Sequence, residues 1–221
     1  MQRHPTAALK RPTCPVCLRP QSTCICPWIT PTAHQVEVVV LQHPLEVDNA
    51  KGSARLLHLS LARSALVAGE VFAGETLQAL VSAPLHARGA APLQTILLYP
   101  DSPQDQALGL PAPPVLRPGQ LREPSRLRLI VLDGTWRKSR KMLYLNPLLH
   151  HLPRLALQGM PASRYRIRKA HKPDQLSTLE ATCAALAQLE GQAEAFAPLL
   201  AAFDGFVARQ WAAGLGPLQA E

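Results

Sequence analysis

The sequence predicts an α/β fold, a mostly parallel sheet flanked by helices, on three observations. Three short apolar runs, at 36–42, 95–99 and 127–132, have the composition of strands. Each run is almost continuous in hydrophobic side chains, which is typical of parallel strands covered on both faces. Helical spacing of leucines over 50–66 falls between the first two runs, so strands and helices alternate as they do in α/β sheets.

Two helices are expected in the C-terminal part of the chain. The segment 177–189 places Leu179, Cys183 and Leu186 on one face through steps of three and four residues. The segment 193–213 is rich in alanine and carries a second apolar stripe that includes three phenylalanines. Core packing is the expected role of both stripes, and Cys183 is expected to be a buried core thiol and not a nucleophile.

Composition and charge limit the classes of function. The chain has 221 residues, 47% of them hydrophobic, and a formal net charge of +8, which favours nucleic acid or a membrane surface as partner. No run approaches the roughly 18 apolar residues of a membrane span, and the N-terminal residues lack a secretory pattern, so a cytoplasmic protein is expected. The sequence holds no GxGxxG, P-loop or HExxH pattern, which argues against the enzyme classes built on them.

Four of the five cysteines lie close together near the N-terminus. Cys14, Cys17, Cys24 and Cys26 form the pattern C-x2-C-x6-C-x1-C. Four thiolates on short loops can converge on one tetrahedral Zn²⁺, which would fold an N-terminal arm and leave no open position for catalysis. Two disulfides fit poorly with a cytoplasmic location, and an iron–sulfur cluster is the other alternative. Structural zinc is expected, and Arg19 with other cations of the arm could contact phosphates.

A turn after the third apolar run is the most informative local feature. Asp133 and Gly134 precede a helix expected over 135–145. Ligands of open α/β sheets bind at the carboxyl ends of the strands, which is where Asp133 lies. The alternative is that Asp133 or Thr135 caps the helix, since both are favourable N-cap residues.

The segment 137–172 is strongly basic, with ten lysines and arginines and no acidic residue. Four of these cations fall in the first turns of the expected helix, where the helix dipole makes positive charge unfavourable by about 0.3–1 kcal/mol each. Their position favours a phosphate-tracking surface, with an ordinary solvated face as the alternative. His150 and His151 in the same segment are expected on the surface and are assigned no metal.

Two further polar clusters lie at expected ends of elements. Ser177 and Glu180 have the spacing of a capping box, and the free N–H groups of the same helix start could hold a carboxylate or a phosphate. His43 and Glu46 follow the first apolar run, and with Arg55 further along they could form part of a strand-end site.

Taken in order, these motifs resemble those of the DTW-domain family, the tRNA-uridine aminocarboxypropyltransferases. The matching segments are the cysteine pattern, HPLE at 43–46, SARLL at 53–57, LLYP at 97–100, DGTW at 133–136 followed by RKSRKM, SRYRIRK at 163–169 and STLEA at 177–181. Each segment alone is a weak signal, whereas the ordered set, which covers about residues 14–190, is specific.

The resemblance implies a reaction, a fold and partners. The reaction is transfer of the 3-amino-3-carboxypropyl group from S-adenosylmethionine to N3 of a tRNA uridine, in bacterial members in the variable loop. Its products are acp3U and methylthioadenosine. The implied fold is SPOUT-like, with a knotted C-terminal region that binds S-adenosylmethionine. The chain would divide into a four-cysteine, zinc-ribbon-like arm at 1–32, a transferase domain at 33–213 and a tail at 214–221, and act as a monomer or a homodimer.

The implied chemistry gives the site residues expected roles. Uridine N3 is a weak acid, so Asp133 is the candidate base, with a grip on the amino group of the co-substrate as the alternative. Trp136 is expected to stack on adenine or uracil, with core packing as the alternative. The set expected to bind S-adenosylmethionine is Leu98, Tyr99, Pro100, Asp133, Thr135, Trp136, Ser177, Thr178 and Glu180. The set expected to contact RNA is His43, Glu46, Arg55, Arg137, Lys138, Arg140, Lys141, Arg164, Arg166, Arg168 and Lys169.

Two other functions would use the same features. One is a non-catalytic zinc-ribbon protein that binds RNA, and the other is an RNA methyltransferase on the same scaffold. Asp133 separates the first from the transferase, because a binding protein does not need that carboxylate. The adenosine by-product separates the methyltransferase from the aminocarboxypropyltransferase, because the first would release S-adenosylhomocysteine and the second methylthioadenosine.

Overall fold

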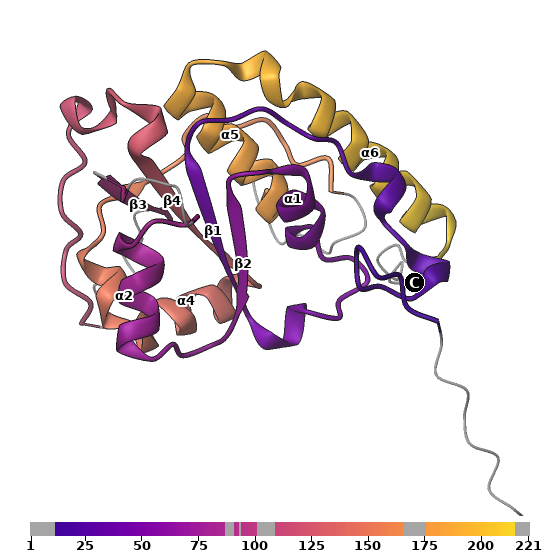
Figure 1. Ribbon diagram of the computed structural model, residues 1–221, viewed down its shortest axis with the longest axis horizontal. Coiled ribbons are helices and arrows are strands. Elements are labelled where there is room, and N and C mark those ends of the chain that lie inside the picture. The colour runs from indigo at the N-terminus through magenta and orange to yellow at the C-terminus, as the bar shows by residue number, and fades with distance from the viewer. Residues whose placement is uncertain (1–11, 87–90, 93, 101–108, 166–175, 215–221) are drawn as a thin grey trace, which may run out of the picture.

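A five-stranded, fully parallel sheet in the order β2-β1-β4-β3-β5 forms the centre of the computed structural model (Figure 1). The structure describes residues 12–86, 91–92, 94–100, 109–165 and 176–214. The strands are β1 (Glu37–Gln42), β2 (Ser64–Ala68), β3 (Gln94–Leu98), β4 (Leu127–Asp133) and β5 (Arg154–Leu155).

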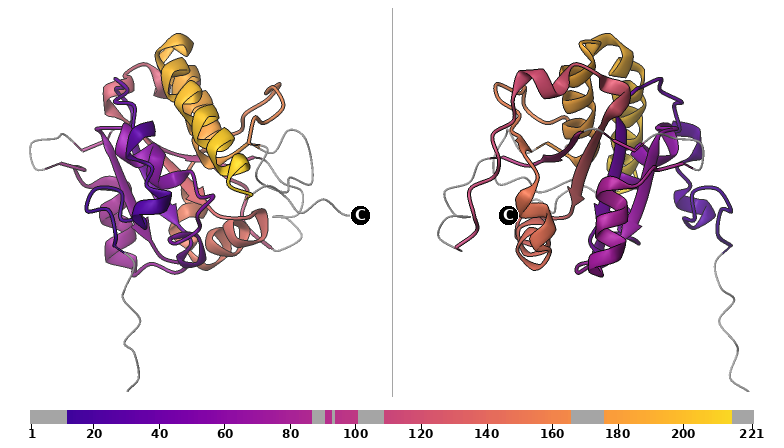
Figure 2. Two further views of the ribbon diagram at one scale, coloured as in Figure 1. Left: turned by 90° about the vertical axis from the view of Figure 1, so that its right-hand side faces the viewer. Right: turned by 60° about the vertical axis from the view of Figure 1, so that its left-hand side comes forward.

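Helices cover both faces of the sheet (Figure 2). The α-helices described are α1 (Ala54–Ser60), α2 (Gly74–Ser82), α4 (Trp136–Leu145), α5 (Thr178–Glu190) and α6 (Ala197–Ala212). Short 3₁₀ helices are η1 (Gln21–Thr23), η2 (Cys26–Trp28), η3 (Pro44–Glu46), η4 (Pro118–Leu121), η5 (Pro124–Arg126), η6 (Pro147–His151) and η7 (Ala193–Phe196). None of the helices in the described part of the chain is long and apolar enough to cross a membrane.

The central strands alternate their side chains between two hydrophobic cores. In β1, Val38 and Val40 pack with α1, α5 and α6, whereas Val39 and Leu41 pack with α2 and α4. Every residue of β1 and of β4 is buried. Burial on both faces explains why these strands read as continuous apolar runs.

The three strands expected from the sequence are confirmed to within one residue at each end, and so is the overall α/β class. The helix expected over 50–66 is wrong in extent, because α1 ends at Ser60 and β2 begins at Ser64. The Ser64 hydroxyl donates to the carbonyl of Leu61 at 2.6 Å and turns the chain into the strand. Pairing of β2 with β1 then outweighs the helical preference of its two alanines and one leucine.

The described part of the N-terminal arm packs on α6 and shares its core. The Arg209 guanidinium donates to the carbonyls of Ser22 and Cys24, at 3.4 Å each. Trp28 lies against Gly205, where an added Cβ would come within 2.5 Å of its ring. Arg19 is fixed by the carbonyls of 50 and 52, at 2.7 Å each, and lies over the Phe206 ring. The Arg19 guanidinium thus holds the arm in place, and contact of the arm's cations with phosphates stays a prediction.

Candidate functional site

A pocket of about 460 Å³, here called the strand-end pocket, opens where β3, β4 and β5 end beside the N-terminus of α5. Its volume is typical of a site for a small ligand. The lining residues are Leu98, Tyr99, Pro100, Val131, Leu132, Gly134, Trp136, Ser139, Leu155, Leu157, Gly159, Met160, Leu176, Ser177, Thr178 and Ala181. Six of them belong to the set expected to bind S-adenosylmethionine.

Asp133 is the last residue of β4 and joins three elements behind the pocket wall. Gln42 Nε2, at the end of β1, donates to Asp133 Oδ2 at 2.9 Å, and the Thr178 hydroxyl, on α5, donates to Oδ1 at 2.6 Å. The side chain is buried, and it adjoins the pocket through Gly134 and Thr178. Thr135 is the N-cap of α4, which confirms the alternative that one of Asp133 and Thr135 caps this helix and assigns the cap to Thr135.

The N-terminus of α5 forms the opposite wall. Ser177 and Glu180 form the expected capping box, with Ser177 N donating to Glu180 Oε2 at 2.7 Å and Glu180 N donating to the Ser177 hydroxyl at 3.2 Å. Leu179 N donates to Ser53 Oγ at 3.4 Å. Of the first four N–H groups at this helix end, only that of Thr178 has no hydrogen-bond partner among the described residues.

Glu180 also holds the segment that follows β5. The Ser163 hydroxyl donates to Glu180 Oε2, and Arg164 N donates to Glu180 Oε1, both at 2.7 Å. The carboxylate is buried and does not itself line the pocket. It fixes the segment that carries Leu157 and Met160 against the start of α5.

Two aromatic rings lie at the pocket. Tyr99 and Trp136 meet edge to face, with ring centroids 6.0 Å apart and planes at 75°. The Arg154 guanidinium lies over the Tyr99 ring, 5.1 Å from its centroid. Trp136 is 43% exposed, so the alternative that it packs in the core is wrong.

The cluster after β1 is internally paired. His43 Nδ1 accepts from Leu45 N at 3.1 Å, so the proton is on Nε2, which donates to Glu70 Oε1 at 2.9 Å. Lys141 Nζ lies 2.9 Å from the other oxygen of Glu70. The hydrogen bonds from Lys141 and His43 hold the pKa of Glu70 below its usual range. Glu46 accepts from Lys138 Nζ at 2.7 Å.

These ion pairs separate two cations of α4, which are already paired with an acid, from Arg137. Lys138 and Lys141 neutralise acids of neighbouring loops, which also relieves their unfavourable position in the helix. The Arg137 side chain is exposed and forms no hydrogen bond or ion pair within the described ranges. Arg140 is partly buried beside it.

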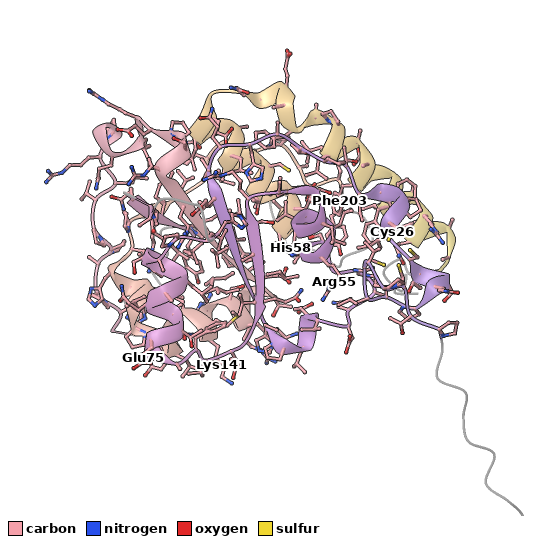
Figure 3. The ribbon with its side chains drawn as sticks, viewed as in Figure 1. Cys26, Arg55, His58, Glu75, Lys141 and Phe203 are labelled. Carbon is pink, nitrogen blue, oxygen red and sulfur yellow. The ribbon has the colours of Figure 1, made fainter. Side chains whose placement is uncertain are left out.

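The remaining RNA-contact candidates are spread over the molecule. Arg55, on α1, lies far from Lys141, on α4, and faces the arm instead (Figure 3). Arg164 reaches Asp204 of α6 at 2.8 Å. The candidates at 166, 168 and 169 lie outside the described residues. His150 is buried, with Nε2 bonded to the Leu143 carbonyl at 2.7 Å, so its expected place on the surface is wrong.

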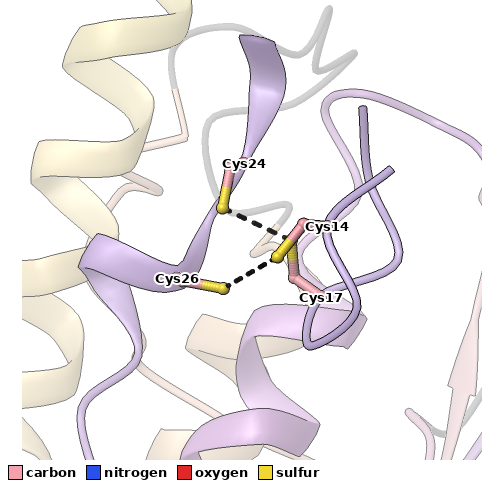
Figure 4. Close-up of side chains that lie close together, drawn as sticks. All are labelled: Cys14, Cys17, Cys24 and Cys26. Carbon is pink, nitrogen blue, oxygen red and sulfur yellow. Dashed lines mark hydrogen bonds between the residues drawn. The ribbon is translucent and has the colours of Figure 1, made fainter. Parts of the chain in front are cut away.

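The four N-terminal cysteines converge on one point (Figure 4). Their sulfur atoms all lie within 4.8 Å of one another, with Cys14 and Cys26 at 3.5 Å and Cys17 and Cys24 at 3.7 Å. A tetrahedron of 2.3 Å metal–sulfur bonds has edges of about 3.8 Å, so the donor set fits such an ion. Backbone N–H groups of Cys17 and Val16 lower the pKa of Cys14 to about 6, which favours the metal-binding thiolate. No disulfide joins these four residues.

Cys183 is a core thiol, as expected. It is buried on α5, and burial together with the Glu180 carboxylate raises its pKa to about 12. A thiol with so high a pKa is a poor nucleophile.

Several residues that line the pocket or hold Asp133 behind it were not anticipated from the sequence. Gln42 is polar at the end of an apolar run, the same signal that drew attention to Asp133. Leu155, Leu157 and Met160 gave no such signal, because β5 has two residues and the segment after it has no periodic pattern.

The geometry defines a class, an α/β protein with a ligand site at the carboxyl edge of a parallel sheet and a four-cysteine arm. The chain belongs to the DTW domain family, whose model matches residues 11–211. It is 33% identical to tRNA-uridine aminocarboxypropyltransferase 2 of Drosophila melanogaster over 187 residues, 84% of this chain and 69% of that protein. It is 29% identical to the protein of the same name from Macaca fascicularis over 191 residues, 83% of this chain and 58% of that one.

A plant relative is more distant. The chain is 29% identical to tRNA-uridine aminocarboxypropyltransferase A of Arabidopsis thaliana over 150 residues, 65% of this chain and 54% of that protein. The chain thus spans between about half and two thirds of the length of these relatives. No solved structure matches the chain.

Proposed function

We propose that the chain is a tRNA-uridine aminocarboxypropyltransferase that uses S-adenosylmethionine to modify N3 of a uridine in the variable loop. A bond forms between N3 and the methionine side-chain carbon, the bond from that carbon to sulfur breaks, and the N3 proton leaves. Methylthioadenosine is the leaving group. One observation carries the proposal: the segments 98–100, 134–136 and 177–178, far apart in sequence, meet in one pocket of suitable size.

The two ends of the pocket suit the two parts of the co-substrate. The single unbonded N–H at Thr178 sits at a helix start, where a carboxylate is favoured. Thr178 is therefore the residue proposed to hold the carboxylate of S-adenosylmethionine, with Ser177 capping the helix. Tyr99 and Trp136 supply the aromatic surfaces on which adenine or uracil would stack. Selection of the aminocarboxypropyl carbon over the methyl carbon would then be a matter of positioning.

Asp133 is proposed as the acceptor of the N3 proton. Its two oxygen atoms accept hydrogen bonds from two neutral donors, Gln42 Nε2 and the Thr178 hydroxyl, and these bonds orient the carboxylate. A carboxylate oriented in this way could equally hold the ammonium group of the co-substrate, and kinetics separates the two roles.

The arm and the fold complete the proposal. Zinc is the proposed ligand of the four cysteines in an arm at 1–32, and with all four positions taken by sulfur it would stabilise the arm and not take part in the reaction. The chain returns from the edge strand β5 to the end of the central strand β4, where α5 begins. This return supports a SPOUT-like arrangement. A tRNA substrate supports a cytoplasmic location.

The test is mass spectrometry of nucleosides from unmodified tRNA incubated with the protein and S-adenosylmethionine. The proposal expects acp3U with methylthioadenosine, both lost in Asp133→Ala and both retained in Asp48→Ala, which removes an exposed acid outside the pocket. A methylated nucleoside with S-adenosylhomocysteine would refute the transferred group. Tight RNA binding with no new nucleoside would favour the binding protein instead.

A further inference from the structure

A second hollow lies on α6, away from the strand-end pocket. We call it the α6 hollow and define it by its lining residues, Arg164, Asp204, Val207, Ala208 and Trp211. The last four are spaced by three, one and three residues, so they form one stripe along the helix. Trp211, at the end of this stripe, is 49% exposed.

Both the backbone and the guanidinium of Arg164 form hydrogen bonds. Its backbone N–H donates to Glu180 Oε1 at 2.7 Å, and its guanidinium Nη1 donates to Asp204 Oδ2 at 2.8 Å. The side chain is nevertheless 72% exposed. The guanidinium thus stands at the edge of the hollow in a fixed position, and binding there would lose little side-chain entropy.

The surfaces of the α6 hollow differ in chemistry. Val207 and Ala208 are the small apolar residues of the lining, and Trp211 adds a half-exposed indole ring. Arg164 and Asp204 add hydrogen-bond donors and an acceptor to the lining. Because this pair has no net charge, the hollow does not favour a phosphate. A flat, neutral ring with a polar edge matches all three surfaces, and a nucleobase is such a ring.

We propose that the α6 hollow binds one unpaired base of the tRNA, stacked on Trp211 with its edge on the Arg164–Asp204 pair. This inference rests on the proposed function, because it takes tRNA as the substrate. It adds a contact that depends on an unpaired nucleotide next to the target.

The position of the hollow supports this role. The segment that lines the strand-end pocket at Leu157 and Met160 continues to Arg164, and Glu180 fixes its far end to α5. The two sites therefore lie at opposite ends of one short, anchored segment. A base held on Trp211 would set the register of the RNA strand relative to the uridine in the pocket.

The test is binding of an unmodified tRNA transcript measured over a series of salt concentrations. Trp211→Ala is expected to weaken binding about 5- to 100-fold at every salt concentration, as loss of one stacked base does. The slope of log K against log salt is expected to stay unchanged, because no phosphate contact is lost. Trp211→Phe should restore most of the affinity, since a phenyl ring also stacks.

A matched control is Val115→Ala, which removes an 81% exposed apolar side chain outside both sites. The proposal is overturned if Trp211→Ala binds tRNA as the unaltered protein does, or if it lowers the salt slope. It is also overturned if the substitution changes the oligomeric mass of the protein, which would make Trp211 an interface residue.

Product analysis on the unaltered protein keeps the two claims apart. If acp3U forms and Trp211→Ala binds normally, the function stands and the base site fails. If Trp211→Ala weakens binding as expected and no acp3U forms, the base site stands and the proposed function fails.

Discussion

The carboxylate of Glu180 should contribute more to stability than its single place in a capping box indicates. It accepts three hydrogen bonds of 2.7 Å, from Ser177 N, the Ser163 hydroxyl and Arg164 N. In Glu180→Gln the amide oxygen can replace only one carboxylate oxygen. Its NH2 group must then face a backbone or hydroxyl donor.

The expected loss follows from these contacts. If the amide oxygen takes the place of Oε2, the partly buried N–H of Arg164 loses its acceptor and the other two bonds lose their charge. A hydrogen bond to a charged group contributes about 1.5–3 kcal/mol, and orphaning a buried donor costs about 1–3 kcal/mol. We expect the free energy of unfolding to fall by about 3 kcal/mol. For a chain of this length that lowers Tm by about 6–12 °C.

The assay is urea unfolding followed by circular dichroism, with Glu194→Gln as the control. Glu194 is an exposed acid on η7 and should change the free energy of unfolding by less than about 0.5 kcal/mol. Ser163→Ala removes one of the three donors and should cost about 1 kcal/mol. A Glu180→Gln protein as stable as the control would refute the reasoning that this carboxylate anchors the segment after β5.

Three further results are expected. Arg137→Ala should lower the salt slope of tRNA binding by about one, whereas Lys138→Ala, whose ammonium already pairs with a carboxylate, should leave the slope unchanged. Burial lowers the pKa of His34 below 6.5, so the contribution of this residue to stability is fully present above about pH 6.5 and is lost as the pH falls through the folded-state pKa. Urea titrations between pH 7.5 and 5 should show the free energy of unfolding fall with pH, and His34→Gln should make that fall smaller. Metal analysis should find one zinc ion per chain, and chelation or Cys17→Ser should lower Tm by several degrees, with equal Tm for treated and untreated protein as the contrary result.

The central strands were predictable because burial dictates their composition. β1 and β4 are covered on both faces, so almost every position must be apolar, and the pattern is visible without a structure. The edge strand β2 is only partly buried and has the composition of a helix, and β5 has two residues. Neither carries a local signal, since both depend on a neighbouring strand to form.

The candidate site, too, could be predicted only where a local sequence pattern marks its residues. Turn residues at the ends of apolar runs located Asp133, and the capping box located Ser177 and Glu180. Charge in the sequence did not reveal which cations are already paired. Lys138 and Lys141 look like Arg137 in the sequence, yet ion pairs with distant loops set them apart. Such pairing depends on contacts between residues about 70 to 90 positions apart, which no local pattern encodes.

The strand-end pocket determines when, during synthesis of the chain, a ligand site can form. Its walls extend from Leu98 to Ala181, so a chain emerging from the ribosome has no complete pocket until α5 has been made. N-terminal parts fold first during synthesis. The arm, by contrast, docks on α6, which is made later still. A ligand that needs the whole pocket would therefore bind only after synthesis has passed the start of α5, and a chain truncated before α5 would lack one wall of the site.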